Sequence, residues 1–259
     1  MPRLRGIDAD RRASQHDADF SEALSRGLTI IGAFEANRLQ MTLGDLSKLV
    51  DLPRATVRRS LHTLMHLGYV SFDGRLFTLT PNILRLATAY RSSSPLIARL
   101  QPICDRISRQ IEGLCSAAVL DDQDTMMIAR AAPGQVTSIG MGLGYRVPAF
   151  CSALGRVLIA GLDDAQLADF FERLDPVRQT VHTVVDKVAL REAIGIVRAQ
   201  DFAYVSEESV LGFQSIAIPV RDHQQRTIAA LNIGHNIGKN IDQRMQSFYL
   251  GILREHLAA

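Results

Sequence analysis

Between Thr42 and Thr80, the pattern of hydrophobic positions predicts two short helices followed by a β-hairpin. Thr42 is a favourable N-cap, and Asp45 three residues later completes the signal for a helix start. A second helix is expected after a turn at Asp51-Leu52, because Pro53 suits the first turn of a helix. The apolar stripes are Leu43, Leu46, Leu49 and Val50 in the first helix and Val57, Leu61 and Leu64 in the second.

The hairpin signal follows the second helix directly. Two strand-like runs, 69–72 and 76–79, flank Asp73-Gly74, the dipeptide most typical of a tight hairpin turn. Two capped helices and a hairpin together predict a winged helix-turn-helix. The stretch Arg54 to His62 is then the candidate recognition helix.

The face of this helix opposite the apolar stripe carries basic side chains, as expected at about 3.6 residues per turn. Arginine pairs with phosphate or with the guanine edge through its planar fork. The candidate DNA-binding residues are Thr42, Arg54, Ala55, Thr56, Arg58, Arg59, His62 and Arg75. A small helical subdomain with a solvated basic face is the alternative, but the caps and the hairpin favour DNA binding.

The segments around this motif suggest the domain boundaries. Residues 1–19 show no period and are expected to form a flexible N-terminal arm, and a helix from Phe20 to Glu35 begins the DNA-binding domain at 20–80. A helix is expected over 81–89, and the run Arg91 to Pro95 should end it, which makes 81–95 a linker helix.

Residues 96–259 alternate strand and helix patterns, which predicts an α+β domain with helices packed on a sheet. The expected helices are Leu96–Glu112, Ser152–Leu162, Asp163–Leu174, Val185–Gln200 and Ile241–Leu257. The expected strands are Ser116–Leu120, Thr125–Ala131, Val136–Met141, Ala203–Ser206, Ser215–Val220 and Thr227–Ile233.

Composition adds little to this division. A chain of 259 residues with 47% hydrophobic side chains suits two domains, and its small net charge of +2 falls within residues 21–80. Cys104, Cys115 and Cys151 are odd in number and lack metal-binding spacing, so neither a disulfide framework nor a zinc site is expected. Without a signal peptide pattern or a membrane-length apolar run, a cytoplasmic protein is predicted.

Three further motifs contain residue types that can take part in chemistry. The glycines between Gly140 and Gly144 do not lead into a helix as a dinucleotide-binding loop does, so a turn is expected. Cys151 would need a nearby histidine to act as a nucleophile, and a buried structural residue is expected instead. Glu207-Glu208 is an acid/base or metal-ligand candidate, although a solvated loop fits better. No catalytic constellation emerges, so neither an enzyme nor a cofactor is predicted.

Thr42–Thr80 is similar to the N-terminal domain of the IclR family of bacterial transcriptional regulators. The second half resembles the same family in three stretches: GYRVPAFCSALGRVLIAG (144–161), EESVLGFQSIAIPV (207–220) and DHQQRTIAALNIG (222–234). The resemblance covers nearly the whole chain beyond residue 20. The Arg-Val-Pro-Ala-Phe-Cys-Ser variant resembles the branch that governs aromatic-acid catabolism through the β-ketoadipate pathway.

The resemblance implies a homodimer, often paired into a homotetramer, with a GAF-like effector-binding domain over 96–259. Such a protein binds a palindromic double-stranded DNA operator and senses a small carboxylic acid, here an aromatic acid or a ring-cleavage product. Effector binding would alter the arrangement of the linker helices and so the engagement of DNA or RNA polymerase. Activation and repression use the same parts, so the sign of regulation stays open.

The resemblance also implies an effector site. Ser215, Asn232 and Gly234 stand where the family places polar contacts to a small carboxylate, and Pro148–Ser152 matches the segment that covers them. Val205 replaces an acidic residue of some members, and Cys151 replaces a histidine of many. From the residues themselves, an aromatic acid needs a ring contact and a compensating cation. The candidate effector-binding residues are Arg146, Ala149, Phe150, Cys151, Ser152, Ser215, Asn232 and Gly234.

Two other readings stay open at this stage. The chain could be an enzyme or metabolite-sensing module whose helix-turn-helix mediates protein contacts. It could also be a DNA-bound repressor without an effector. Steep salt dependence and preference for one DNA site separate the first alternative from a regulator.

Overall fold

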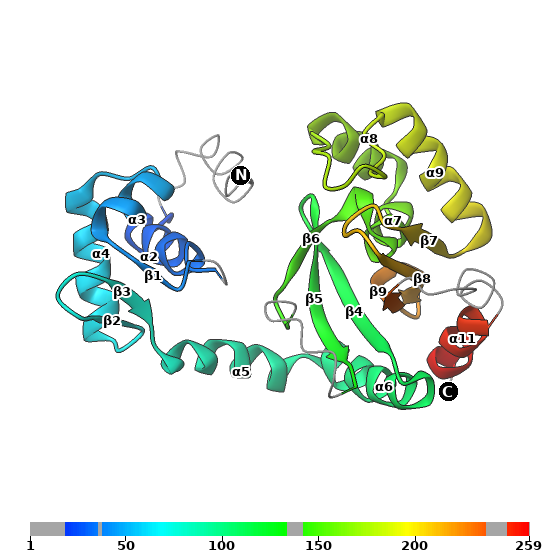
Figure 1. The fold of residues 1–259 in the computed structure, drawn as a ribbon, viewed down its shortest axis with the longest axis horizontal. Helices are drawn as coiled ribbons and strands as arrows, with labels where there is room; N and C mark the ends of the chain where they lie inside the picture. The colour runs from blue at the N-terminus through cyan, green and yellow to red at the C-terminus, as the bar shows by residue number, and fades with distance from the viewer. Residues whose placement is uncertain (1–18, 36–37, 134–141, 237–247, 259) are drawn as a thin grey trace. The chain divides into compact units, whose positions relative to one another are not determined.

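The computed structural model describes residues 19–35, 38–133, 142–236 and 248–258. The chain divides into two compact units, Met1–Ser94 and Pro95–Ala259 (Figure 1). Each unit has its own hydrophobic core and is described here by itself.

The N-terminal unit is a winged helix-turn-helix, as the hydrophobic pattern predicts. Its described elements are α2 (Glu22–Gly32), β1 (Gln40–Met41), α3 (Leu43–Leu49), α4 (Arg54–His66), β2 (Val70–Phe72) and β3 (Phe77–Leu79). The three strands form an antiparallel sheet in the order β1-β3-β2. Side chains from every helix and strand meet in one core, in which Ile30, Leu46, Val57, Leu61 and Phe77 are buried.

Local hydrogen bonds show why these elements begin and turn where they do. Thr42 and Asp45 form the expected capping box of α3, with Thr42 Oγ1 accepting from the Asp45 N–H at 3.2 Å. At the hairpin tip, Asp73 Oδ1 accepts from the backbone N–H groups of Arg75 and Leu76 at 2.8 and 2.7 Å. Gly74 has a φ of +104°, which favours glycine at this position. The Asp-Gly hairpin prediction is therefore confirmed.

The linker differs from the prediction. A short helical turn, η1 (Pro81–Ile83), leads into α5 (Leu84–Ser93), so the helix continues through the serines expected to end it. The hydroxyls of Ser92 and Ser93 donate to carbonyls one turn earlier, at Thr88 and Ala89, which lets serine remain in a helix. The break is confined to Ser94, because the residue before a proline is disfavoured in the helical region.

The C-terminal unit is built on six antiparallel strands in the order β6-β5-β4-β9-β8-β7. The strands are β4 (Leu114–Asp121), β5 (Asp124–Ala131), β6 (Arg146–Pro148), β7 (Ala203–Ser206), β8 (Phe213–Arg221) and β9 (Thr227–Asn236). The helices are α6 (Pro95–Ile111), η2 (Ala149–Cys151), α7 (Ala153–Ala160), α8 (Asp164–Arg173), α9 (Lys187–Gln200) and α11 (Leu250–Ala258). The predicted α+β class is confirmed.

Helices cover the two faces of this sheet differently (Figure 1). α6 and α11 pack on one face, where Cys115 and Ala117 of β4 join their core. α7 packs on the other face against Ala118, with α9 behind it. Ser116 alternates with Cys115 and Ala117 along β4 and therefore lies on the α7 face.

Most predicted elements of this unit lie within a few residues of the observed ones, and two points need comment. Strand β6 was not predicted, because its three residues carry too short a pattern. The strand expected at 136–141 and the first part of the helix expected at 241–257 lie outside the described residues.

Candidate DNA-binding and effector sites

The second helix of the N-terminal unit, α4, exposes the residues expected to read DNA. Arg58, Arg59 and His62 are exposed on the side opposite the buried Val57 and Leu61. The sequence of α4 contains no acidic residue, so nothing on the helix itself neutralises the charges of Arg58 and Arg59. Such a face suits the polyanionic backbone of DNA.

Arg54 begins α4 and lies close to the start of α3. A Cβ added at Gly44 would lie 3.1 Å from Nη2 of Arg54, so the guanidinium rests over Gly44. Arg54 is the first residue of α4, where backbone N–H groups at the helix start can also bind a phosphate. Ala55 is exposed and Thr56 half-buried in that same turn.

The hydroxyl of Thr42 is already bonded at the start of α3, so a contact from this hydroxyl to DNA would be made in addition to those bonds. The hydroxyl donates to Asp45 Oδ2 at 2.7 Å and accepts from the Asp45 N–H. The bond from the Thr42 hydroxyl, and then that from its backbone N–H, lowers the pKa of Asp45. Thr42 therefore caps α3 whether or not DNA is present.

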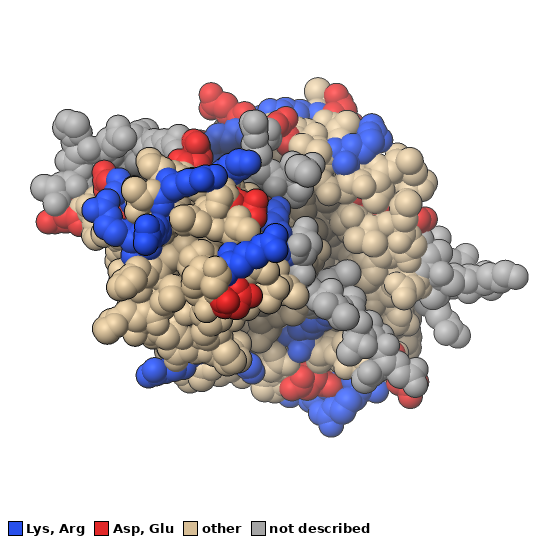
Figure 2. Space-filling model, turned by 60° about the vertical axis from the view of Figure 1, so that its left-hand side comes forward, with Lys and Arg blue, Asp and Glu red and all other residues tan. Residues whose placement is uncertain are grey.

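Arg75 lies beside the hairpin tip, where its side chain is exposed. The face of the N-terminal unit turned forward in Figure 2 carries a band of Lys and Arg side chains. Basic groups on the wing and on α4 fit a protein that grips the DNA backbone beside the groove it reads.

In the C-terminal unit, the expected polar residues of the effector site lie on the α7 face of the sheet. Ser215 on β8 and Asn232 on β9 are buried, with exposed fractions of 6% and 4%. Gly234, opposite Ser215, is covered by an aromatic ring: a Cβ there would lie 2.5 Å from Cζ of Phe213. Buried polar groups on one side of a ring are typical of a small-molecule site.

The sequence reasoning missed Ser116, which joins this group. It is directly opposite Asn232 across β4 and β9, and its exposed fraction is 2%. Its backbone N–H donates to Asn232 Oδ1 at 3.1 Å. A polar residue alternating with Cys115 and Ala117 in a buried strand was the available signal.

Most of the covering segment is buried in the hydrophobic core. Ala149, Phe150 and Cys151 form η2 and belong to a core cluster with Phe170 and residues of α9. Ser152 caps α7 by accepting from the Gly155 N–H at 3.1 Å. Each of these four residues therefore has a structural role.

Cys151 is unsuited to nucleophilic chemistry. Burial, and then the negative charge of Glu208, raise the pKa of its thiol to about 12. The thiol therefore stays protonated at neutral pH, and the thiolate that would attack an electrophile is not formed.

Arg146 is held by acidic side chains rather than left for an effector. Its guanidinium binds the carboxylate of Asp121 and donates to the Asp121 carbonyl oxygen at 3.1 Å. Its Nε donates to Asp124 Oδ2 at 3.1 Å. These contacts join β6 to the β4–β5 hairpin. Its positive charge is already compensated.

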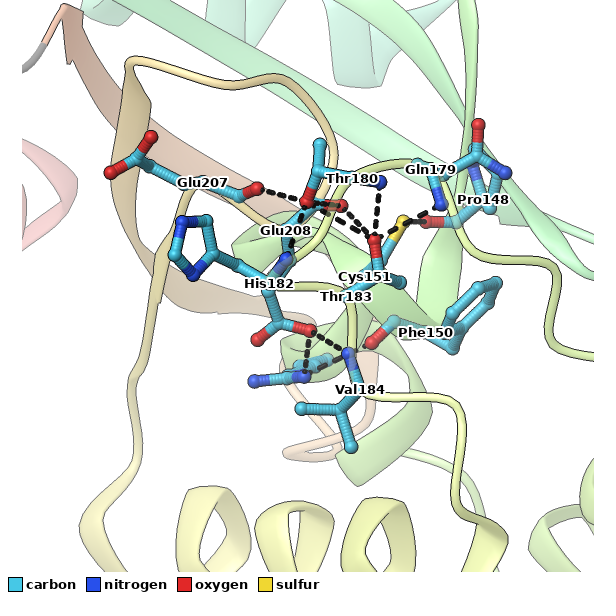
Figure 3. A network of polar contacts seen from close by, with 11 residues as sticks. Pro148, Phe150, Cys151, Gln179, Thr180, His182, Thr183, Val184, Glu207 and Glu208 are labelled. Atoms are coloured by element: carbon cyan, nitrogen blue, oxygen red, sulfur yellow. Dashed lines mark hydrogen bonds and ion pairs between the residues drawn. The ribbon is translucent and has the colours of Figure 1, made fainter.

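Glu208 corrects the expectation of a solvated pair of glutamates. Its carboxylate is buried and accepts from Arg156 Nη2 at 2.7 Å and from the Val184 N–H at 3.2 Å (Figure 3). The hydroxyl of Thr183 donates to the Glu208 carbonyl at 2.7 Å. A buried arginine on α7 supplies the countercharge, a long-range partner that the sequence pattern does not show.

The second residue of the pair differs from Glu208. Glu207 is half-buried, and its carboxylate accepts from the Gly212 N–H at 2.9 Å. The two glutamates therefore stabilise the loop after β7 rather than forming an acid/base pair. Within the described residues, no group of three or more His, Cys, Asp or Glu side chains has a metal-binding arrangement.

A separate small cleft lies near the other end of β8 and β9. Its volume is about 80 Å³, and Val157, Pro219, Arg221 and Thr227 are among its lining residues. This volume is well below the roughly 300 Å³ of a small-molecule pocket. Its lining residues do not include Ser116, Ser215 or Asn232, so this cleft is distinct from the polar group around Asn232.

No helix in the described part of the chain is long and apolar enough to cross a membrane.

Comparison with known families agrees with both halves of this architecture. The IclR helix-turn-helix domain matches residues 23–74, and the C-terminal domain of the bacterial transcriptional regulator IclR matches residues 88–257. A winged helix-turn-helix followed by an α+β ligand-binding domain defines a one-component transcriptional regulator. The chain belongs to the IclR family of bacterial transcriptional regulators.

Individual relatives extend this assignment. The Pca regulon regulatory protein of Pseudomonas putida is 39% identical over 238 residues, which cover 92% of this chain and 82% of that protein. The crystal structure of a putative transcriptional regulator from Rhodococcus sp. RHA1 is 34% identical, covers 92% of this chain and 96% of its own, and superposes with a TM-score of 0.79. The inducer-binding domain of a PobR double mutant from Acinetobacter, in complex with 3-hydroxybenzoic acid, is 30% identical over 64% of this chain and 95% of its own, with a TM-score of 0.59.

Proposed function

We propose that this protein is a transcriptional regulator of aromatic-compound catabolism that binds a palindromic operator as a dimer or tetramer. It senses a small aromatic carboxylic acid in its C-terminal unit and is not an enzyme. The observation that carries the DNA half is the exposed basic face of α4 within a capped helix-turn-helix and wing. The related inducer-binding domain that holds 3-hydroxybenzoic acid supports the effector class.

The DNA-binding surface consists of Arg54, Arg58, Arg59 and Arg75, with Ala55, Thr56 and His62 beside them on α4 and Thr42 holding the start of α3. Each subunit places α4 in a major groove, and the two grooves are about one helical turn apart on the palindrome. Arg58 and Arg59 contact base edges or phosphates, and Arg75 on the wing contacts the neighbouring backbone.

The effector site is the polar group on the α7 face, formed by Ser116, Ser215 and Asn232 beside Phe213. The linker helices have two arrangements in equilibrium, and an aromatic acid bound at this site shifts that equilibrium. The size of the shift is set by the difference between the acid's affinities for the two arrangements. Through this equilibrium the acid changes the engagement of the operator or of RNA polymerase.

Binding to DNA from upstream of the protein's own gene tests this proposal. We expect fluorescence anisotropy to show a preference for that DNA over a scrambled duplex, with affinity falling steeply as salt rises. We also expect 3-hydroxybenzoate or 4-hydroxybenzoate to bind the same preparation in calorimetry. Equal affinity for both duplexes at every salt concentration would favour the alternative of a sensing module whose helix-turn-helix contacts proteins.

A further inference from the structure

A row of side chains crosses the α7 face of the sheet from β5 to β9. Strand register places Arg130 of β5 opposite Ser116 of β4, and Ser116 opposite Asn232 of β9. Facing residues in antiparallel strands have Cβ atoms about 4.5–5.5 Å apart. The side chain of Arg130 therefore starts close enough to Ser116 and Asn232 for its guanidinium to reach the polar groups of both residues.

The direction of Arg130 is fixed by its strand neighbours and by Gln101. Ala129 and Ala131 pack on the core beneath α6, so the side chain between them leaves the opposite face. On the α6 side, Gln101 accepts from the Arg130 N–H at 3.2 Å and donates to its carbonyl at 2.9 Å. This two-point bond holds the backbone of the strand at this residue.

Arg130 differs from the other partly buried arginines of this unit in having no countercharge. Arg146 and Arg156 bind acidic side chains, whereas the guanidinium of Arg130 forms no ion pair or hydrogen bond with any described residue. Burial lowers the pKa of Arg130. A partly buried cation of this kind is stabilised by a bound anion.

The neighbouring polar groups have hydrogen-bonding capacity to spare. Asn232 uses its Oδ1 to accept from the Ser116 N–H, which leaves the two donors of its Nδ2. The hydroxyls of Ser116 and Ser215 and the Nδ2 of Asn232 form no hydrogen bond with a described residue, although all three residues are more than nine-tenths buried. None of these polar atoms is among the fully buried, unpartnered atoms of the described residues, so each keeps some accessible surface and can bond to a ligand.

An aromatic surface bounds this polar group. The ring of Phe213 lies over Gly234, where any larger residue would displace it. A cation, several donors and a ring at one place match an aromatic carboxylate, with its charge on one side and its ring on the other.

We propose that Arg130 pairs with the carboxylate of the effector, with Ser116 and Asn232 as hydrogen-bond donors to the same group. This inference rests on the proposed function and replaces Arg146, whose donors are already bound to Asp121 and Asp124. The aromatic ring then lies toward Phe213.

The test compares Arg130→Gln with Arg146→Gln in the full chain by calorimetry, with 3-hydroxybenzoate and 4-hydroxybenzoate as probes. We expect Arg130→Gln to weaken acid binding by about tenfold or more, because a charge-assisted pair is lost. We expect Arg146→Gln to change the affinity by less than about threefold. The uncharged amides of the two acids, which bind without this ion pair, should bind wild type and Arg130→Gln alike.

Operator binding without acid separates the possible failures. Arg130→Gln should bind the upstream DNA as the wild type does, which shows that the variant is folded. Wild-type acid affinity in Arg130→Gln, or an equal loss of acid and amide binding, would overturn the inference while leaving the proposed function intact. A wild-type protein that binds neither acid would overturn both the inference and the proposed effector class.

Discussion

The surroundings of individual arginines differ sharply between the two units. Arg146, Arg156 and Arg221 are bound to aspartate or glutamate and hold strands and loops of the C-terminal unit together. Arg58 and Arg59 are exposed on a helix without acidic residues. The charges of Arg58 and Arg59 are therefore available to a polyanion, which is the residue-level basis of the DNA-binding proposal.

Replacing Arg58 or Arg59 by alanine should weaken binding to the upstream DNA by about tenfold, because the proposed interface gives each arginine one phosphate or base contact. For a phosphate contact, the slope of log affinity against log salt should also fall by about 1. Anisotropy titrations at several salt concentrations measure both quantities. Arg106→Ala, which removes an exposed charge from α6, is the matched control and should leave the affinity unchanged.

His235 predicts a pH dependence of stability. Burial lowers the pKa of His235 below its ordinary value, and its buried Nε2 has no hydrogen-bond partner in the described structure. The unfolded chain therefore binds the proton more readily, and stability should fall as the pH drops through about 6.5, the ordinary histidine pKa. Urea unfolding between pH 8 and pH 5.5 should show this loss.

The control for this pH dependence is a second histidine in a different environment. His235→Phe should flatten the profile between pH 8 and 5.5, whereas His223→Gln, at an exposed turn, should not. A His235→Phe profile as steep as that of the wild type would assign the dependence to other groups.

At the scale of the element, local signals predicted most of the fold. The cap at Thr42 and the Asp73-Gly74 turn are short-range patterns, and each is present in the structure. Strand β6 was not predicted because its three residues are too few to show a period. The pairing of Glu208 with Arg156 and the row from Arg130 to Asn232 join residues far apart in the chain, which periodicity does not reveal.

The packing of η2 on α7 depends on the absence of a side chain at Gly155. A Cβ there would lie 2.0 Å from the carbonyl oxygen of Ala149 and 2.3 Å from its Cα, and a backbone cannot yield as a flexible side chain does. We expect Gly155→Ala to lower the unfolding free energy by about 2 kcal/mol or more, as overpacking does.

Gly195 offers the matched control for this substitution. It lies inside α9 with no atom within 4 Å of an added Cβ. Gly195→Ala should raise the unfolding free energy by roughly 0.5–1 kcal/mol, because alanine is the better helix former. Urea unfolding of both variants checks the pair, and equal effects would contradict the close approach at Gly155.

The buried pair Arg156–Glu208 joins α7 to the loop after β7. Replacing Glu208 by glutamine leaves a buried arginine without its countercharge, which should cost about 3–5 kcal/mol of unfolding free energy. The double variant Arg156→Met, Glu208→Leu should recover part of this loss. Arg26→Gln removes an exposed pair with Glu22 and should cost less than about 1 kcal/mol.

At the scale of the whole molecule, the two units have separate cores and separate candidate sites. The linker between them is helical up to Ser94, where one extended residue separates α5 from α6. A regulator requires that the two sites influence each other, and allostery is a coupling free energy that acts equally in both directions.

The most direct test of the central claim is the dissociation constant for the upstream DNA at one salt concentration, measured without and with saturating aromatic acid. We expect the acid to change this constant by about fivefold or more, and the DNA to change the acid's affinity by the same factor. An acid that binds the protein while leaving the DNA affinity unchanged would contradict the account of an effector-controlled DNA-binding regulator.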